Sequence, residues 1–310
     1  MGNQKPSIVV ICGPTGIGKT AAAITLAEAC NGEIVSADSM QIYRLMEIGT
    51  AKPTPGEQSR IPHHLIDIIT PEIPFDAARY EKMAREVISD LHGQGKLPII
   101  AGGTGFYIKA LTQGLFDSIP HDPEVRQRLK KEADILGGDA LHKRLSACDP
   151  ETGRKLHPND TYRILRALEI FETTGKPLSS HHRGHQFSKR PFRQLKIGLT
   201  MPREALYERI NARVDQMLQA GLLNEVQILV EKGYASELKS MQSIGYRHMV
   251  DFIFGRLDWQ EAVRTMKRDT RRYAKRQMVW FKADPEIHWL APDQLSEMRQ
   301  LVEAFLETSA

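Results

Sequence analysis

Residues 13–20 read GPTGIGKT and match the phosphate-binding pattern G-x-x-x-x-G-K-[ST]. Three glycines allow the backbone to turn tightly and to point its N–H groups inward, which makes a concavity that binds an anion. Lys19 is placed to reach the outer phosphates, and the Thr20 hydroxyl is placed to hold Mg²⁺. The predicted anion site comprises Gly13, Pro14, Thr15, Gly16, Ile17, Gly18, Lys19 and Thr20.

The sequence on both sides of this loop decides the fold class. Residues 8–12 are apolar and mostly β-branched, as in a buried parallel strand, and residues 21–29 indicate a helix whose N-terminus faces the anion. Strand and helix patterns then alternate through residues 33–37, 77–91 and 97–101. This order predicts an α/β fold in which helices flank a parallel sheet, as in P-loop NTPases.

Three chemically suited segments follow predicted strands. They are the loop 13–20, Asp38 after residues 33–37, and the glycine-rich residues 102–105. Ligands of parallel sheets bind beyond the carboxyl ends of the strands, so we expect these segments to meet in one cleft.

The strand pattern disappears between residues 117 and 190. Helical patterns at residues 124–134, 140–147 and 160–174 replace it, and residues 195–199 then indicate a strand that returns to the sheet. We therefore predict a helical insertion at 117–190 in a catalytic core made of residues 1–116 and 191–310. In the second part of the core we expect helices at 203–221, 224–232, 247–254 and 259–281, a strand at 287–290, and an acidic last helix.

Composition excludes several classes of protein. The 310 residues are 41% hydrophobic and 26% charged, which is typical of a globular protein. No stretch approaches the roughly 20 apolar residues of a membrane span. The first strand begins too near the N-terminus for a signal peptide. Three cysteines without metal or disulfide spacing suit a reducing compartment, so we expect a cytoplasmic protein with no membrane partner.

The charge is unevenly distributed. Residues 121–283 contain 31 Lys and Arg against 20 Asp and Glu, a net charge of +11. Seven cations on the helix 259–281 would cover about half of its circumference. They are Arg264, Lys267, Arg268, Arg271, Arg272, Lys275 and Arg276. This pattern indicates a polyanionic partner, although a well-solvated amphipathic helix has the same appearance.

The loop alone leaves the reaction open, because ATP, GTP or another diphosphate would fit it. Asp38 is either a metal support, as in hydrolysing P-loop proteins, or a general base beside an acceptor. No guanine-reading Asn-Lys-x-Asp sequence is present. On this basis the candidates are a nucleotide or metabolite kinase and a non-catalytic RNA-binding protein.

Seven further blocks occur in a fixed order. They are DSMQIYR at 38–44, GTAKP at 49–53, PHHLID at 62–67, GGTGFY at 102–107, LHPNDTYRILRALEI at 156–170, QSIGYR at 242–247 and TRRYAKRQMVWF at 270–281. Together they closely resemble the bacterial tRNA dimethylallyltransferases, or tRNA isopentenyltransferases, from residue 7 to about 290. Gly16-Ile17 departs from the family's usual Ala and small residue but keeps the glycine loop. The zinc finger of eukaryotic relatives has no counterpart here.

The resemblance implies a reaction. The family moves the dimethylallyl group from its diphosphate to N6 of adenine 37, next to the tRNA anticodon, and releases diphosphate. Residues 13–20 would then hold the donor's diphosphate with Mg²⁺ on Thr20, and ATP would compete without being consumed. Lys19 and Arg213 would stabilise the leaving charge, and Asp38 would be the base. The alternative for Arg213 is an i,i+4 surface pair.

The resemblance also implies the tRNA contacts. They are Asp38, Ser39, Met40, Gln41, Thr104, Arg126, Tyr162, Arg163, Ile164, Leu165 and Arg166. The partner would be the anticodon stem-loop, bound by a monomeric enzyme. A relative that prenylates free adenine nucleotides would need neither the insertion nor the basic helix.

Two histidine pairs or clusters also invite interpretation. HHRGH at 181–185 lacks carboxylate and cysteine partners, and we place it in a loop, where it would add pH-dependent charge near tRNA rather than bind a metal. We expect His63 and His64 to be structural.

Overall fold

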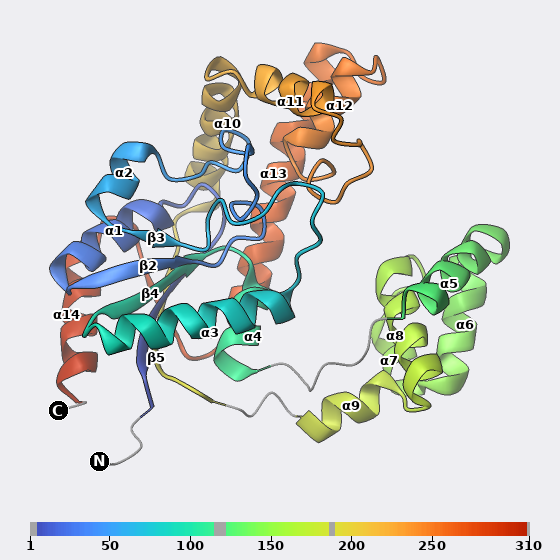
Figure 1. The fold of residues 1–310 in the computed structure, drawn as a ribbon, viewed down its shortest axis with the longest axis horizontal. Helices are drawn as coiled ribbons and strands as arrows, with labels where there is room; N and C mark the ends of the chain where they lie inside the picture. The colour runs from blue at the N-terminus through green and yellow to red at the C-terminus, as the bar shows by residue number, and fades with distance from the viewer. Residues whose placement is uncertain (1–4, 115–121, 186–189, 309–310) are drawn as a thin grey trace. The chain divides into compact units, whose positions relative to one another are not determined.

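The computed structural model describes residues 5–114, 122–185 and 190–308 (Figure 1). The chain divides into two compact units. The core unit contains Met1–Thr112 and Pro191–Ala310, and the insertion unit contains Gln113–Arg190. The predicted helical insertion at 117–190 lies within the second unit. No helix in the described ranges is both long enough and apolar enough to cross a bilayer.

The core unit contains a six-stranded, fully parallel sheet, which confirms the predicted fold class. The strands are β1 (Ser7–Cys12), β2 (Gly32–Ser36), β3 (His63–His64), β4 (Leu97–Gly102), β5 (Arg193–Leu199) and β6 (Ile287–Leu290). Their order is β3-β2-β4-β1-β5-β6, so β1 is central. The two-residue strand β3 was not predicted, because it is too short to show a periodicity.

Helices cover the sheet on both faces. α1 (Lys19–Ala29) and α14 (Leu295–Glu307) share one apolar cluster with β1 residues Val9 and Ile11. α3 (Ala77–Gly93) contacts β2 and β4, and α4 (Gly105–Gln113) follows β4 directly. The right-handed crossovers of a parallel sheet place α1 and α3 on opposite faces. The predicted helix at 77–91 is confirmed.

Four helices of the core unit lie between β5 and β6, and each was predicted to within three residues at either end. They are α10 (Arg203–Gln219), α11 (Leu222–Glu231), α12 (Tyr246–Ile253) and α13 (Trp259–Lys282). α10 and α12 both pack on α13, and α11 packs on α12 (Figure 1). The short helix α2 (Pro55–Arg60) was missed, although Thr54 and Glu57 form a capping box at its start.

The insertion unit is helical, as predicted. It contains α5 (Pro123–Leu136), α6 (Gly138–Cys148), α7 (Pro150–Lys155), α8 (Thr161–Thr174) and α9 (Leu178–His185). Its core includes Leu129, Leu145 and Leu168.

The placement of residues 181–185 in a loop was wrong, because they form the end of α9. Pro177, just before this helix, has the fixed backbone angle that suits a helix start. Its carbonyl accepts a hydrogen bond from Ser180 N at 3.0 Å. The Asp149 carboxylate accepts a second one from Ser179 N at 2.9 Å. These hydrogen bonds stabilise the start of α9, whose sequence shows no apolar periodicity that would predict a helix.

Candidate active site

The loop 13–20 connects β1 to α1 and has the backbone of an anion cradle. Gly13, Gly16 and Gly18 have φ angles of 146°, 80° and 106°, which favour glycine. A Cβ on Gly13 would also lie 3.0 Å from the Leu199 carbonyl oxygen. Ile17 is fully buried and anchors the loop in the core. Because Gly18 caps α1 without a side chain, the first N–H groups of the helix remain free for an anion.

A cavity of about 560 Å³ lies beside this loop. The predicted residues Lys19, Thr20, Asp38 and Arg213 all line it. Segment 50–53, Gln41 and Arg209 complete much of its wall, with Tyr273 and Gln277 from α13. The structure therefore brings together the loop after β1, Asp38 after β2 and the end of β4, since Ala101 and Gly102 also line the cavity.

Two partly buried cations, Lys19 and Arg213, line the cavity from different elements. Burial lowers the pKa of Lys19 to about 8, while the nearby charge of Asp38 opposes this shift and Arg213 adds to it. Burial also lowers the pKa of Arg213, and Asp38 again opposes the shift. Lys19 Nζ donates a hydrogen bond to the Pro14 carbonyl at 2.8 Å. Both cations pay a desolvation cost that a bound polyanion would reduce. Arg213 lines the cavity but is partly exposed, so its role as a diphosphate contact stays a prediction.

Asp38 follows β2 directly and is held by its own turn. Its Oδ1 accepts hydrogen bonds from Met40 N at 2.8 Å and Gln41 N at 3.3 Å. The Thr104 hydroxyl oxygen accepts from Ser39 N at 3.0 Å, which ties the same turn to the end of β4. The predicted contacts 38–41 and Thr104 are thus neighbours, although they are 63 or more residues apart in sequence.

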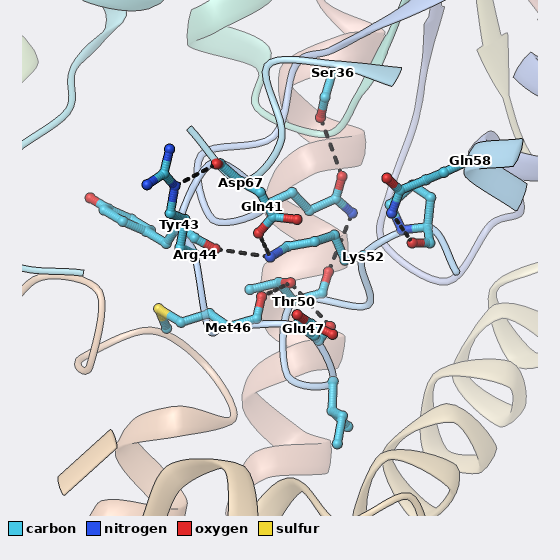
Figure 2. A network of polar contacts seen from close by, with 12 residues as sticks. Ser36, Gln41, Tyr43, Arg44, Met46, Glu47, Thr50, Lys52, Gln58 and Asp67 are labelled. Carbon is cyan, nitrogen blue, oxygen red and sulfur yellow. Dashed lines mark hydrogen bonds and ion pairs between the residues drawn. The ribbon is translucent and has the colours of Figure 1, made fainter. Parts of the chain in front are cut away.

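Gln41, residues 50–53 and Glu57 form part of the cavity wall, and Figure 2 shows the polar network within segment 36–67 that holds this part of the chain. Gln41 Nε2 donates to the carbonyls of Thr50 at 3.4 Å and Ala51 at 3.1 Å, and its Oε1 accepts from Ser36. The buried Lys52 donates to the Tyr43 carbonyl at 2.9 Å and pairs with Asp67. Sequence reasoning missed Lys52, and the GTAKP block was the signal that could have found it.

Gln277 is a further site residue that sequence reasoning missed. Its Oε1 accepts from Thr15 N and its Nε2 donates to the Gly103 carbonyl, each at 2.8 Å. Thr15 lines the cavity, and Gly103 follows Gly102, which also lines it. A Cβ on Gly103 would lie 2.3 Å from Gln277 Nε2. One buried amide on α13 therefore fixes the phosphate loop and the end of β4. Its position in a basic helix drew attention to the neighbouring charges instead.

The basic helix is partly neutralised within the core unit. Arg264 pairs with Glu261 at 2.6 Å, Lys267 with Asp215 at 2.6 Å, and Arg268 with Asp269 at 2.8 Å. Arg271 donates to Asn211 at 2.6 Å. Arg272, Lys275 and Arg276 are exposed, with Arg272 3.8 Å from Asp269. The exposed cationic surface of α13 is therefore smaller than the stripe of seven cations predicted from the sequence.

The predicted contacts of the insertion unit fall into two groups. Arg126 and Arg166 each lie within 3.0 Å of the fully buried Glu169, and the Arg126 guanidinium covers the Tyr162 ring at 4.8 Å. Tyr162 and Arg163 are exposed. Ile164 and Leu165 are buried, so their side chains belong to the core of the insertion unit rather than to its surface.

Fold and cavity together define an α/β protein of the phosphate-binding-loop class, with a carboxylate and two partly buried cations around one cavity. Residues 41–284 match the family model described as IPP transferase. The chain is 54% identical to a tRNA dimethylallyltransferase of Desulfosudis oleivorans, over 97% of this chain and 96% of that protein. It is 52% identical to one of Desulfatibacillum aliphaticivorans, over 98% and 99%. The chain therefore belongs to the IPP transferase family, which confirms the resemblance seen in the sequence.

Solved structures agree with this assignment. The tRNA isopentenylpyrophosphate transferase of Bacillus halodurans superposes with a TM-score of 0.74 at 39% identity, over 98% of both chains. A eukaryotic dimethylallyltransferase acting on tRNA gives a TM-score of 0.80 at 31% identity, over 94% of this chain and 75% of that one.

Proposed function

We propose that this protein transfers the dimethylallyl group from dimethylallyl diphosphate to N6 of adenine 37 in tRNA, giving N6-isopentenyladenosine and diphosphate. The observation that carries the proposal is the joint presence of Asp38, Lys19 and Arg213 around one cavity beside the glycine loop. The names of the relatives, which act as tRNA dimethylallyltransferases, supply the substrate class.

The donor would bind with its diphosphate in the loop. During transfer the bond between C1 of the allyl group and the diphosphate oxygen breaks, and its electron pair leaves with diphosphate. Lys19, Arg213 and the backbone N–H groups would bind this developing charge more tightly than the ester, which lowers the barrier. Their arrangement is fixed before the reaction, because Gln277 holds Thr15 N and Pro14 O holds Lys19 Nζ.

The acceptor would lie beside Asp38. N6 of adenine is conjugated with the ring and must lose a proton as its new bond to C1 forms. The Asp38 carboxylate would accept that proton as the general base. The target adenine has to leave its stack to enter the cavity, which costs least in a single-stranded loop such as the anticodon loop.

Mg²⁺ fits the residues at this site. The Thr20 hydroxyl and the Asp38 carboxylate line the same cavity. Within the described residues, no three or more His, Cys, Asp or Glu gather as a complete metal site. Mg²⁺ commonly combines few protein oxygens with water and substrate phosphates, which agrees with this donor set. Bound with the donor, it would neutralise charge on the diphosphate.

The remaining features of the proposal concern setting and partners. We propose a cytoplasmic enzyme that acts as a monomer on the anticodon stem-loop. Exposed Arg163, Arg272 and Arg276 would contribute phosphate contacts, and Tyr162 offers a ring for stacking.

The decisive experiment is incubation with dimethylallyl diphosphate, Mg²⁺ and unmodified tRNA, followed by mass analysis of the nucleosides. Formation of N6-isopentenyladenosine without added ATP is the expected result. ATP-dependent phosphorylation of a small molecule would instead support the kinase alternative. Parallel reactions with free AMP test the nucleotide-prenylating alternative, for which we expect no product.

A further inference from the structure

Three consecutive backbone N–H groups in the core unit point at one carboxylate. Glu225 in α11 accepts through Oε2 from Glu47 N at 3.0 Å and from Ile48 N at 2.8 Å. Its Oε1 accepts from Gly49 N at 3.2 Å. A run of N–H groups of this kind is an anion-binding concavity. Here a carboxylate of the same chain occupies it.

A fourth donor completes the arrangement. The Tyr246 hydroxyl at the start of α12 donates to Glu225 Oε1 at 2.6 Å. Tyr246 is fully buried, and burial together with Glu225 raises its pKa well above the usual value. A Cβ on Gly49 would lie 2.4 Å from the Tyr246 ring, so the segment packs directly on the tyrosine. Two of the quoted blocks, GTAKP and QSIGYR, therefore meet at Glu225.

The held segment continues into the cavity wall. Thr50, Ala51 and Lys52 line the cavity. The carbonyls of Thr50 and Ala51 accept from Gln41 Nε2 (Figure 2), and Gln41 N donates to Asp38. A continuous chain of hydrogen bonds thus leads from Glu225 through residues 47–51 and Gln41 to the proposed base.

Residues 45–67, which include the held segment, contain unusual backbone conformations. Leu45, Ala51, Leu65 and Asp67 are non-glycine residues with φ angles of 67°, 47°, 60° and 54°. Such conformations are disfavoured and persist where the surroundings enforce them, often at functional sites. Ala51 lies two residues after Gly49, the last residue whose N–H Glu225 holds, so this carboxylate is well placed to enforce its conformation.

We propose that Glu225 is a positioning residue for the transfer reaction. By holding segment 47–49, it would fix the Thr50 and Ala51 carbonyls, then Gln41, and through Gln41 the orientation of Asp38 toward the acceptor. Glu225 does not line the cavity and would touch neither substrate. The proposal rests on the transfer reaction proposed above, since the role concerns its geometry.

The test compares Glu225→Gln with wild type and with Glu231→Gln, an exposed position at the end of the same helix. The Gln amide keeps the size of the side chain but turns an N–H₂ group toward N–H donors and removes the charge. We expect the single-turnover rate at saturating substrates to fall on the order of 10- to 100-fold, the scale for a misplaced catalytic group. The affinity for inorganic diphosphate should change less than about twofold, since the loop 13–20 is untouched.

Hydrogen exchange provides a readout that does not depend on activity. Glu225→Gln should accelerate exchange of a peptide covering residues 45–53 and leave a peptide covering residues 8–20 unchanged. Glu231→Gln should match wild type in rate and exchange. A rate within about twofold of wild type for Glu225→Gln, or unchanged exchange at 45–53, would overturn the proposal.

Two further outcomes are separable. If Glu225→Gln does not fold, Tyr246→Phe removes one of the four hydrogen bonds and keeps the packing. Tyr246→Phe should then lower the single-turnover rate and accelerate exchange at residues 45–53, each by roughly several-fold less than expected for Glu225→Gln. A wild-type rate together with wild-type exchange would overturn the proposal. If wild type transfers no dimethylallyl group, the proposed function fails, whereas exchange at 45–53 still tests the contact.

Discussion

Asp38 is the residue whose role most needs a direct measurement. It lines the cavity with Thr20, so base and metal support are both compatible with its position. Met40 N and Gln41 N donate to its Oδ1, which orients the carboxylate before any substrate binds. We assign it the proton because no other carboxylate from the ends of β1, β2 or β4 lines the described cavity, and Glu57 comes from α2.

Asp38→Asn keeps the size of the side chain and removes its charge. As a base, Asp38 is worth roughly 10² to 10⁴ in the chemical step, so the single-turnover rate should fall by that factor. tRNA binding should change little, because an amide oxygen can still accept a hydrogen bond from N6. The measurement is the single-turnover rate across a Mg²⁺ titration. Recovery at high Mg²⁺ would reassign Asp38 to the metal.

Lys19 makes donor binding depend on pH. In the free protein it is charged below about pH 8 and neutral above, since burial lowers its pKa from 10.5 to about 8. Affinity for inorganic diphosphate should therefore fall as the pH rises through about 8, because the neutral amine attracts the anion less. Calorimetric titrations from about pH 7 to about pH 9.5 would measure this, with Lys19→Met as the control. An equal pH dependence in Lys19→Met would assign the effect to another group.

The lowered pKa of Lys19 affects folding stability in the opposite direction from donor affinity as the pH rises. The unfolded chain keeps the Lys19 proton up to its ordinary pKa, so it binds more protons than the folded protein between about pH 8 and 10.5. This group therefore makes folding stability rise with pH in that window, while donor binding weakens. Below about pH 8 the buried charge is a cost that the ligand would offset.

Among the elements, helix α13 contributes both to the cavity and to the exposed cationic surface. Its buried face supplies Gln277 to the cavity rim, and its outer face supplies the exposed Arg272, Lys275 and Arg276. Several of its other cations are neutralised by Glu261, Asp215 and Asp269. Charge counting along a helix cannot identify the partner of Lys267, because Asp215 belongs to α10.

Gly103→Ala tests how α13 is attached to the cavity. The new Cβ would lie 2.3 Å from Gln277 Nε2, so Gln277 must shift and release Thr15 N or the Gly103 carbonyl. We expect a loss of about 1 to 3 kcal/mol in the free energy of unfolding, the usual cost of an unmet buried hydrogen bond, together with reduced activity. Urea unfolding measures the first. Gly93→Ala, with nothing within 4 Å of the new Cβ, is the control and should not destabilise.

We predict that the exposed cations Arg163 in α8 and Arg276 in α13 contribute more to the salt dependence of tRNA binding than Lys267 in α13. Arg163→Ala or Arg276→Ala should each reduce the salt slope of binding by about 0.9, the value for one phosphate contact. Arg163 qualifies although it lies 3.3 Å from Asp160, because an exposed ion pair of this kind is weak. Lys267→Ala should change it less, because Lys267 is paired with Asp215 at 2.6 Å. Filter binding across a salt series provides the slopes. Equal slopes for all three variants would remove the distinction.

For the molecule as a whole, short-range sequence patterns predicted the fold and part of the site, but they did not predict the long-range side-chain contacts. The parallel sheet, the glycine loop and Asp38 follow from short-range signals, namely apolar strands, glycine spacing and a polar residue at a strand end. Gln277 and Glu225 act on backbone groups 262 and about 177 residues away, so no local pattern identifies their partners. Ile164 and Leu165 lie in a stretch that resembles tRNA-contacting segments, yet the helix turns them into the core.

We expect the insertion unit to affect tRNA affinity and the core unit to affect the rate of the chemical step. Arg163 pairs with Asp160 within the insertion unit, whereas Lys19 belongs to the cradle of the core unit. We therefore expect Arg163→Ala to weaken tRNA binding with an unchanged single-turnover rate at saturation. Lys19→Ala should lower that rate on the order of 10²- to 10³-fold, the scale for losing one donor to a developing anion, with unchanged tRNA affinity. In the double variant the effects on kcat/KM should add within about 0.5 kcal/mol, as for independent sites. A larger coupling would mean that tRNA binding by the insertion unit helps to assemble the donor cradle.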